Sequence, residues 1–208
     1  MRRIIAFMVF LCLLCSSVRP ASGAMESATD AARRGADQIL ALLQDPAFHN
    51  PATKEAQRKK IENAMLGLFD FDEFSSRTVG PNWRNFTPDQ KKRFQEAFTT
   101  LLRNTYIDTL DSYSGEKVEF TGEISGNNGT RSEVRMNFLG KDAVHPVAFR
   151  MLVKNGRWVV YDVLIEGISM IKNYRDQFRD LLAKGNPDEL ISRISAKAEE
   201  VKNQPKQK

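Results

Sequence analysis

The sequence predicts an α+β fold in which a four-stranded antiparallel sheet packs against several helices. Three observations lead to this prediction. Apolar residues recur at helical spacing over residues 27–112, they alternate with polar residues over residues 118–153, and an apolar strand then leads directly into an amphipathic helix over residues 158–181. Helices grouped before and after one run of strands are typical of an α+β domain. We expect residues 25–202 to form this single domain and residues 203–208 to be a polar tail.

The N-terminal half contains the helical segments, which are indicated by apolar stripes and by their end residues. We expect helices over Ser27–Leu43 and Thr53–Phe69, and a shorter one over Asp70–Val79. A long helix should begin at Thr87-Pro88-Asp89-Gln90, which combines an N-cap threonine, a proline at N1 and a glutamine at N3 in a capping box. Its apolar stripe continues to about Ser112.

The following segments alternate with a period of two. Apolar and polar residues alternate over Val118–Ile124, Val134–Phe138 and Val147–Val153. Gly126-Asn127-Asn128-Gly129 and Asn155-Gly156 are typical hairpin turns. Successive strands joined by short turns predict an antiparallel meander. Because each of these three strands has one polar face, helices should cover the other face of the sheet.

The segment Trp158–Phe178 connects the sheet to the C-terminal helices. Its first part, Trp158–Ile165, is apolar on both faces, so we expect a strand that is covered on both sides. Strict alternation places its residues on two faces: Trp158, Val160 and Leu164 on one, and Val159, Tyr161, Val163 and Ile165 on the other. Gly167 should end the strand, a helix is expected from Ile168, and a last helix follows Asn186-Pro187.

Residues 1–24 have the features of a secretory signal peptide. Arg2 and Arg3 precede an apolar run, Ile4–Leu14, and small residues in Ser22-Gly23-Ala24 fit cleavage after Ala24. We expect cleavage and export. An uncleaved membrane anchor is the alternative, but the 11-residue run is too short to span a bilayer as a helix.

Cleavage of this segment changes the chemistry of the protein. Both cysteines, Cys12 and Cys15, lie within it, so the mature chain has neither a disulfide nor a thiol. The segment also holds three arginines and no acid, so its removal lowers the net charge from +5 to +2. This modest charge and the exported location argue against a nucleic-acid partner.

Catalytic and metal-binding patterns are missing from the sequence. The two histidines, His49 and His145, have no HExxH or cysteine setting, so we expect no metal site, no cofactor and no catalytic residue. Asp162 interrupts the central strand. It either hydrogen-bonds to backbone or to an arginine such as Arg150 or Arg175, or it is the acid or base of a small periplasmic enzyme. A chaperone-like module that binds other proteins is a further alternative.

The central segment also carries a family resemblance. Asp162-Val163, Glu166-Gly167-Ile168-Ser169 and Asn173-Tyr174-Arg175-x-x-Phe178 are similar to the hallmark segment of the MlaC family, periplasmic phospholipid-binding proteins that are also called toluene-tolerance proteins. Further matches occur in order along the chain: Phe69-Asp70-Phe71, Gly80-Pro81-x-Trp83, Thr87-Pro88-x-Gln90, Phe94-x-x-x-Phe98-x-x-Leu101-Leu102, Tyr106 and Trp158-x-Val160-Tyr161-Asp162-Val163. The resemblance covers residues 30–198, and its specificity lies in the order of these matches.

The resemblance implies a non-enzymatic carrier of phospholipid. Such carriers move lipid between an outer-membrane lipoprotein complex and an inner-membrane ABC transporter, and so maintain outer-membrane lipid asymmetry. Both complexes would be partners of this chain, and contact with the membrane region would be transient. The resemblance also implies a curved sheet with an apolar cavity between sheet and helices, in which the acyl chains lie while the headgroup stays near solvent.

The junction between the central strand and the following helix is the predicted lipid site. The predicted lipid-binding residues are Phe98, Leu101, Tyr106, Val147, Phe149, Met151, Val163, Ile165, Ile168 and Ile171. Arg150 and Arg175 are predicted at the headgroup rim. Each apolar residue in this set has ordinary core packing as its alternative, because composition does not separate a filled core from a hollow one.

Overall fold

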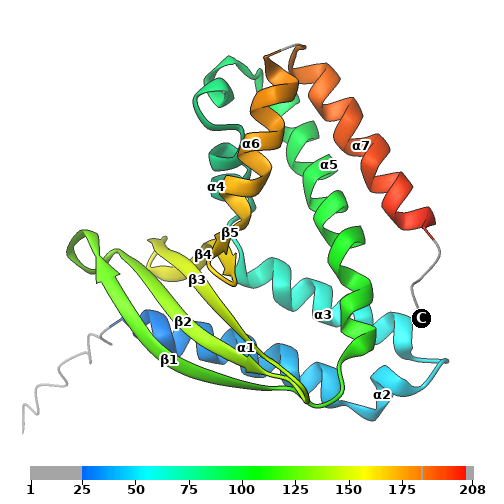
Figure 1. The fold of residues 1–208 in the computed structure, drawn as a ribbon, viewed down its shortest axis with the longest axis vertical. Coiled ribbons are helices and arrows are strands. Elements are labelled where there is room, and N and C mark those ends of the chain that lie inside the picture. Colours follow the sequence, from blue (N-terminus) through cyan, green and yellow to red (C-terminus); the bar gives the residue numbers. More distant parts are fainter. Residues whose placement is uncertain (1–24, 184, 205–208) are drawn as a thin grey trace, which may run out of the picture.

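The computed structural model describes residues 25–183 and 185–204, and it has two parts joined by one long helix (Figure 1). Helices α4 (Phe71–Val79), α6 (Met170–Leu182) and α7 (Pro187–Asn203) form one part. The other part contains the sheet and the helices α1 (Ala28–Gln44), α2 (Pro46–His49) and α3 (Lys54–Leu68). Helix α5 (Pro88–Tyr106) runs from the first part into the second. The predicted α+β class is confirmed.

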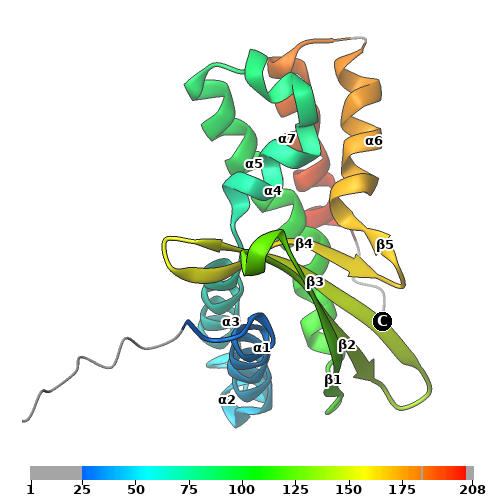
Figure 2. The same ribbon diagram turned by 90° about the vertical axis from the view of Figure 1, so that its left-hand side faces the viewer.

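The sheet is open, curved and antiparallel, with the strand order β1-β2-β3-β4-β5 (Figure 2). Its strands are β1 (Lys117–Gly126), β2 (Arg131–Leu139), β3 (Val144–Lys154), β4 (Arg157–Ile165) and β5 (Ile168–Ser169). The meander is therefore as predicted, but it has one strand more than the predicted four. Glu166 and Gly167 both have a positive φ and form a tight turn that folds Ile168 back onto Ile165. The expected helix consequently begins at Met170 and not at Ile168.

Strand β4 contains a bulge that the alternation pattern does not reveal. The register with β3 shifts between Arg150 and Met151, which leaves Tyr161 without an opposite residue. As a result, Val160 and Val163 pack into the same cluster on one side of the sheet, and Tyr161 packs against the helices on the other side. The faces predicted from strict alternation are therefore wrong beyond Tyr161. The expectation that the strand is covered on both sides holds for its central residues.

The helix ends follow the local chemistry of the sequence. The capping box at Thr87 is present in full, with Thr87 Oγ1 accepting from the Gln90 amide and the Gln90 side chain accepting from the Thr87 amide. The long helix ends at Tyr106, earlier than predicted, and continues as a 3-10 helix over Ile107–Ser112. The short helix α2 was not expected. It begins at Pro46 because Asp45 caps it.

Buried apolar residues form three separate clusters. The helical cluster contains Phe74, Val79, Phe86, Phe94, Ala97, Phe98, Leu101, Ile171, Tyr174, Phe178, Leu190, Ile191, Ile194 and Ala198. The sheet cluster contains Ala28, Ala31, Ala32, Val134, Met136, Met151, Trp158, Val160 and Val163. The N-terminal cluster contains Leu43, Phe48 and Ile61. Alanines on α1 let this helix approach the sheet closely, and Trp158 Nε1 donates to the Glu26 carbonyl at 2.9 Å to hold its start.

The predicted signal peptide lies outside the described residues, as do residues 205–208 of the predicted polar tail. Within the part of the chain that the structure covers, no helix is long and apolar enough to cross a membrane.

Candidate functional site

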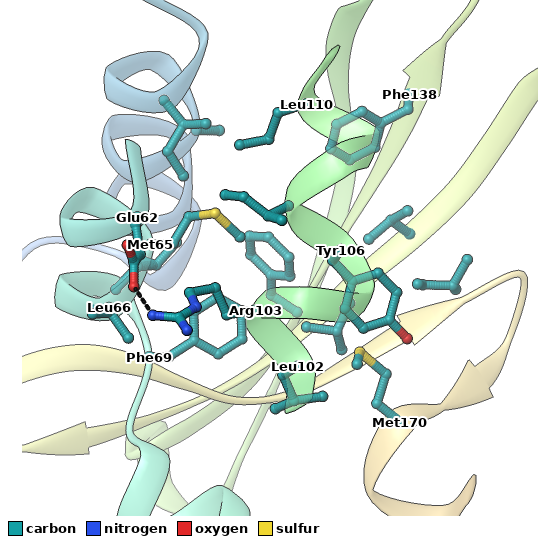
Figure 3. A pocket seen from close by; sticks show the side chains of 18 of the residues that line it. Glu62, Met65, Leu66, Phe69, Leu102, Arg103, Tyr106, Leu110, Phe138 and Met170 are labelled. Carbon is teal, nitrogen blue, oxygen red and sulfur yellow. Dashed lines mark ion pairs between the residues drawn. The ribbon is translucent and has the colours of Figure 1, made fainter. Parts of the chain in front are cut away.

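A large cavity lies where the three apolar clusters meet, with a volume of about 740 Å³. Its wall comes from α1, α3, α4, α5, the 3-10 helix after α5, strands β1 to β4 and the start of α6. The lining is almost entirely apolar, and Figure 3 shows side chains from the helices and from the sheet pointing into the same space. Such a volume lies within the ~300–1,000 Å³ typical of ligand sites.

The lining side chains differ from those of an ordinary core. Met65, Phe69, Leu102 and Phe138 are only half-buried although they lie between the layers of the fold, because one side of each faces the cavity. By contrast, Phe98 in the helical cluster has no exposed surface. A filled core leaves few voids larger than a water molecule. The fold therefore places a concave apolar wall where close packing would be expected.

Half of the predicted lipid-binding residues line this cavity. These are Tyr106 from α5, Val147 and Phe149 from β3, and Val163 and Ile165 from β4. The structure thus brings together residues from three elements that are far apart in the sequence. Contact of these residues with lipid stays a prediction.

The other five predicted residues lie elsewhere. Phe98, Leu101 and Ile171 belong to the helical cluster, and Met151 belongs to the sheet cluster, so these four are packed core. Phe98 alone contacts four aromatic rings, with centroid distances of 4.9–5.6 Å. Ile168 is 67% exposed, because the turn at Glu166-Gly167 carries it outward.

Two tyrosines lie at the boundary between the cavity and the helical cluster. Tyr106 lines the cavity, and Tyr174 lies behind it in the cluster against Phe98, with the rings of Tyr174 and Phe98 4.9 Å apart. Burial raises the pKa of Tyr174 well above its ordinary value, and the neighbouring Tyr106 adds to this shift. Tyr174 therefore stays neutral at physiological pH, so no charge is placed behind the apolar wall.

The two arginines predicted at the rim are both engaged away from the cavity. Arg150 lies on the opposite face of β3 from Phe149 and forms ion pairs with Glu133 at 3.1 Å and with Asp162 at 3.4 Å. Arg175 donates from Nε to the Arg77 carbonyl at 2.8 Å, near the end of α4. Neither lines the cavity.

Asp162 is 2% exposed and holds the turn between the sheet and α6. Its Oδ1 accepts from the Ile171 amide at 3.1 Å, and its Oδ2 accepts from Ser169 Oγ at 2.7 Å. The structural alternative for this residue, a hydrogen bond to backbone together with an arginine, is confirmed. Asp162 is not among the residues that line the cavity.

Replacement of Asp162 by asparagine tests whether this residue is structural. The new amide side chain keeps one acceptor oxygen but loses the charge opposite Arg150, so the free energy of unfolding should fall by about 1–3 kcal/mol. The amount of lipid bound per folded protein should not change. Denaturant titration and lipid extraction from the same preparation measure both quantities. A stable D162N variant that has lost all ligand would contradict the structural role.

The sequence did not predict the polar residues of the cavity wall, which are Glu62, Arg103, Glu116 and His145, with Thr99. Arg103 Nη1 faces Glu62 Oε1 at 3.5 Å across the gap between α5 and α3 (Figure 3). His145 Nδ1 lies 3.2 Å from Glu166 Oε1, and hydrogen bonds from Ser114 lower the pKa of Glu116.

A pattern that identifies Arg103 is present in the sequence. Four lining residues, Thr99, Leu102, Arg103 and Tyr106, recur at i, i+3, i+4 and i+7, which is one side of α5 next to the aromatic stripe. Two polar members on an otherwise apolar helix side indicate a wall that meets water or a polar ligand. Among the residues that the structure describes, no group of three His, Cys, Asp or Glu side chains could hold a metal ion.

Comparisons with known proteins agree with this architecture. The family model described as MlaC protein matches residues 33–196. The intermembrane phospholipid transport system binding protein MlaC of Haemophilus influenzae is 24% identical over 170 residues, which cover 80% of this chain and 79% of that protein. The toluene tolerance protein ttg2D of Pseudomonas putida is 32% identical over 129 residues, 61% of this chain and 60% of that protein.

A solved structure has the same fold. It is that of the phospholipid-binding protein from Ralstonia solanacearum in complex with a phospholipid, with a TM-score of 0.75 and 21% identity, and the match covers 85% of this chain and 99% of that one. The family model spans well over half of the chain, including the cavity wall from Ala36 to Met170. The chain therefore belongs to the MlaC family.

Proposed function

We propose that this protein is a periplasmic phospholipid carrier that holds acyl chains in the cavity between its sheet and its helices. The single observation that supports this most is the apolar cavity of about 740 Å³. The names of the relatives point the same way, since one is a binding protein of a phospholipid transport system and the Ralstonia protein carries a phospholipid.

The physical chemistry of lipid transfer suits such a cavity. Each methylene that leaves water contributes about 0.8 kcal/mol, so an acyl chain cannot cross an aqueous compartment uncovered. The donor membrane shelters the same methylenes, so the net affinity is only the difference between two apolar environments. A carrier therefore needs a predominantly apolar wall that resembles the membrane interior, and the lining, in which charged residues are few, provides it.

We further propose that the carrier works between an outer-membrane lipoprotein complex and an inner-membrane ABC transporter, after removal of residues 1–24. Direct acid–base catalysis by Asp162 is disfavoured because its oxygens are engaged by Ser169 and the Ile171 amide. The chaperone-like alternative, in which an apolar patch on the outer surface binds other proteins, is disfavoured because so many of the half-buried apolar side chains face an internal space.

Native mass spectrometry of the protein purified from the periplasm tests the carrier function. We expect phospholipid to be retained on the protein, and organic extraction should identify its headgroup and chains. The mature N-terminus in the same spectrum reports cleavage after Ala24. Protein that carries no lipid and also fails to take lipid from phospholipid vesicles would exclude the carrier function.

A further inference from the structure

Arg103 is the one Arg or Lys among the described residues that line the cavity. We propose that its guanidinium holds the phosphodiester of the bound phospholipid, and that Glu62 competes with that phosphate for Arg103. The inference rests on the proposed carrier function and adds the residue that recognises the polar end of the ligand.

The position of Arg103 suits the polar end of a lipid whose chains lie in the cavity. Its side chain is 41% exposed, and Leu66, which lines the cavity on facing helix α3, is 37% exposed. The cavity therefore reaches solvent between α3 and α5. In Figure 3 the guanidinium points across this gap toward Glu62, near the apolar Leu66. An arginine can lay its aliphatic stem on such a wall and keep its charge in water.

The guanidinium of Arg103 is only loosely engaged. Its nearest carboxylate oxygen, on Glu62, is 3.5 Å away, and its Nε donates to Asn104 Oδ1 at 3.3 Å. Elsewhere on the same helix, Arg93 Nη2 lies 2.6 Å from Asp188 Oδ1. A guanidinium has five N–H donors in a planar fork, and two parallel donors match two oxygens of a phosphate. Arg103 can make this contact with little loss of other hydrogen bonds.

Glu62 has a second cationic partner. Its Oε2 accepts from Lys59 Nζ at 3.0 Å, one turn earlier on α3. A phosphate that takes over Arg103 therefore leaves the Glu62 carboxylate paired with Lys59. The local charge of Lys59, Glu62 and Arg103 together is +1, which favours a singly charged phosphodiester. Because every phospholipid with a headgroup alcohol on its phosphate has this group, Arg103 should recognise such lipids irrespective of that headgroup.

Titration calorimetry on the delipidated mature protein tests this assignment. The titrants are soluble dihexanoyl phosphatidylcholine, dihexanoyl glycerol without a phosphate, and inorganic phosphate. The variants are Arg103→Gln, Arg103→Lys, Glu62→Gln and the control Lys92→Gln. Lys92 is exposed on the same helix and does not line the cavity. Lys92→Gln lowers the net charge by the same amount as Arg103→Gln, so it controls for charge alone.

We expect R103Q to weaken binding of the phosphatidylcholine about tenfold, the loss expected for one charge-assisted contact, and to leave diacylglycerol binding unchanged. R103K should bind with intermediate affinity because it keeps the charge but not the fork. E62Q should bind the phosphatidylcholine roughly threefold more tightly, since a competing ion pair is removed. K92Q should match the wild type. The opposite signs of R103Q and E62Q exclude a general loss of folding as the cause.

Three results would overturn the assignment: equal affinity of wild type and R103Q for the phosphatidylcholine, an equal loss for diacylglycerol, or an equal effect of K92Q. Inorganic phosphate that binds as tightly as the short-chain lipid would also overturn it, because the site would then serve free phosphate. Wild-type protein that binds neither lipid would reject the carrier function itself, which is a separate outcome.

Discussion

Replacement of Phe98 by alanine should lower the free energy of unfolding by about 3–5 kcal/mol, the cost of removing a large buried aromatic side chain. Phe98 is fully buried. Its ring stacks on that of Phe74, is tilted against that of Phe94, and makes edge-to-face contacts with Tyr174 and Phe178. Its removal leaves a void that four rigid rings cannot easily fill. Urea denaturation followed by circular dichroism measures the change. At temperatures where the variant is folded, its lipid content should equal that of the wild type.

Phe149 provides the matched control for this experiment. It is also a phenylalanine of the predicted lipid site, but it lines the cavity and its ring lies 6.3 Å from that of Phe69. Phe149→Ala should cost less stability, about 1–2 kcal/mol, because part of the ring already has no packing partner. It should change lipid binding more than Phe98→Ala does. Equal destabilisation by the two substitutions would contradict the distinction between packed core and cavity wall.

Introduction of a tryptophan at Val147 should reduce lipid occupancy by roughly tenfold or more. The indole would occupy part of the cavity, so lipid could enter only if the indole moved aside or the wall deformed, at a cost of about 1–3 kcal/mol. Val147 lies in the middle of the cavity wall, between Met136 on β2 and Ile165 on β4. The lipid-free variant should melt no lower than the lipid-free wild type, since the indole fills space and gains contacts. Phospholipid extracted per protein and thermal melting of both forms measure the two effects.

Val144→Trp is the control for Val147→Trp. Val144 is 57% exposed at the start of the same strand and does not line the cavity, so the same substitution there should leave lipid occupancy unchanged. A V147W protein that retains full lipid would show that the acyl chains lie elsewhere.

The order of the elements could be predicted from the sequence because it depends on local chemistry. A few neighbouring residues determine each of these local structures: the capping box at Thr87, the turn at Asn155-Gly156 and the alternating strands. The fifth strand was missed because it is two residues long and its partner is set by the positive φ at Glu166 and Gly167.

The cavity wall could be predicted only in part because it depends on packing between distant elements. Tyr106 and Phe98 both belong to the apolar stripe of one helix, yet one faces the cavity and the other fills a core. Periodicity identifies an apolar side of a helix, but not whether another side chain fills the space opposite. The arginine of the wall was not predicted for a related reason: Arg103 is far from the central strand in the sequence, and its partner Glu62 lies on α3.

The bulge at Tyr161 determines which residues of strand β4 form the cavity wall. Beyond it, Val163 and Ile165 face the cavity, while Asp162 turns to Ser169 and the start of α6. Without this extra residue in the strand pairing, Tyr161 and Val163 would share one face and Asp162 would share the face of Val160, so that a carboxylate would face the cavity and the turn would lose its acceptor. Deletion of Tyr161 alone would restore strict alternation and keep Val160 and Val163 on one side, so it would remove the packing of Tyr161 on the helices but leave the wall in place.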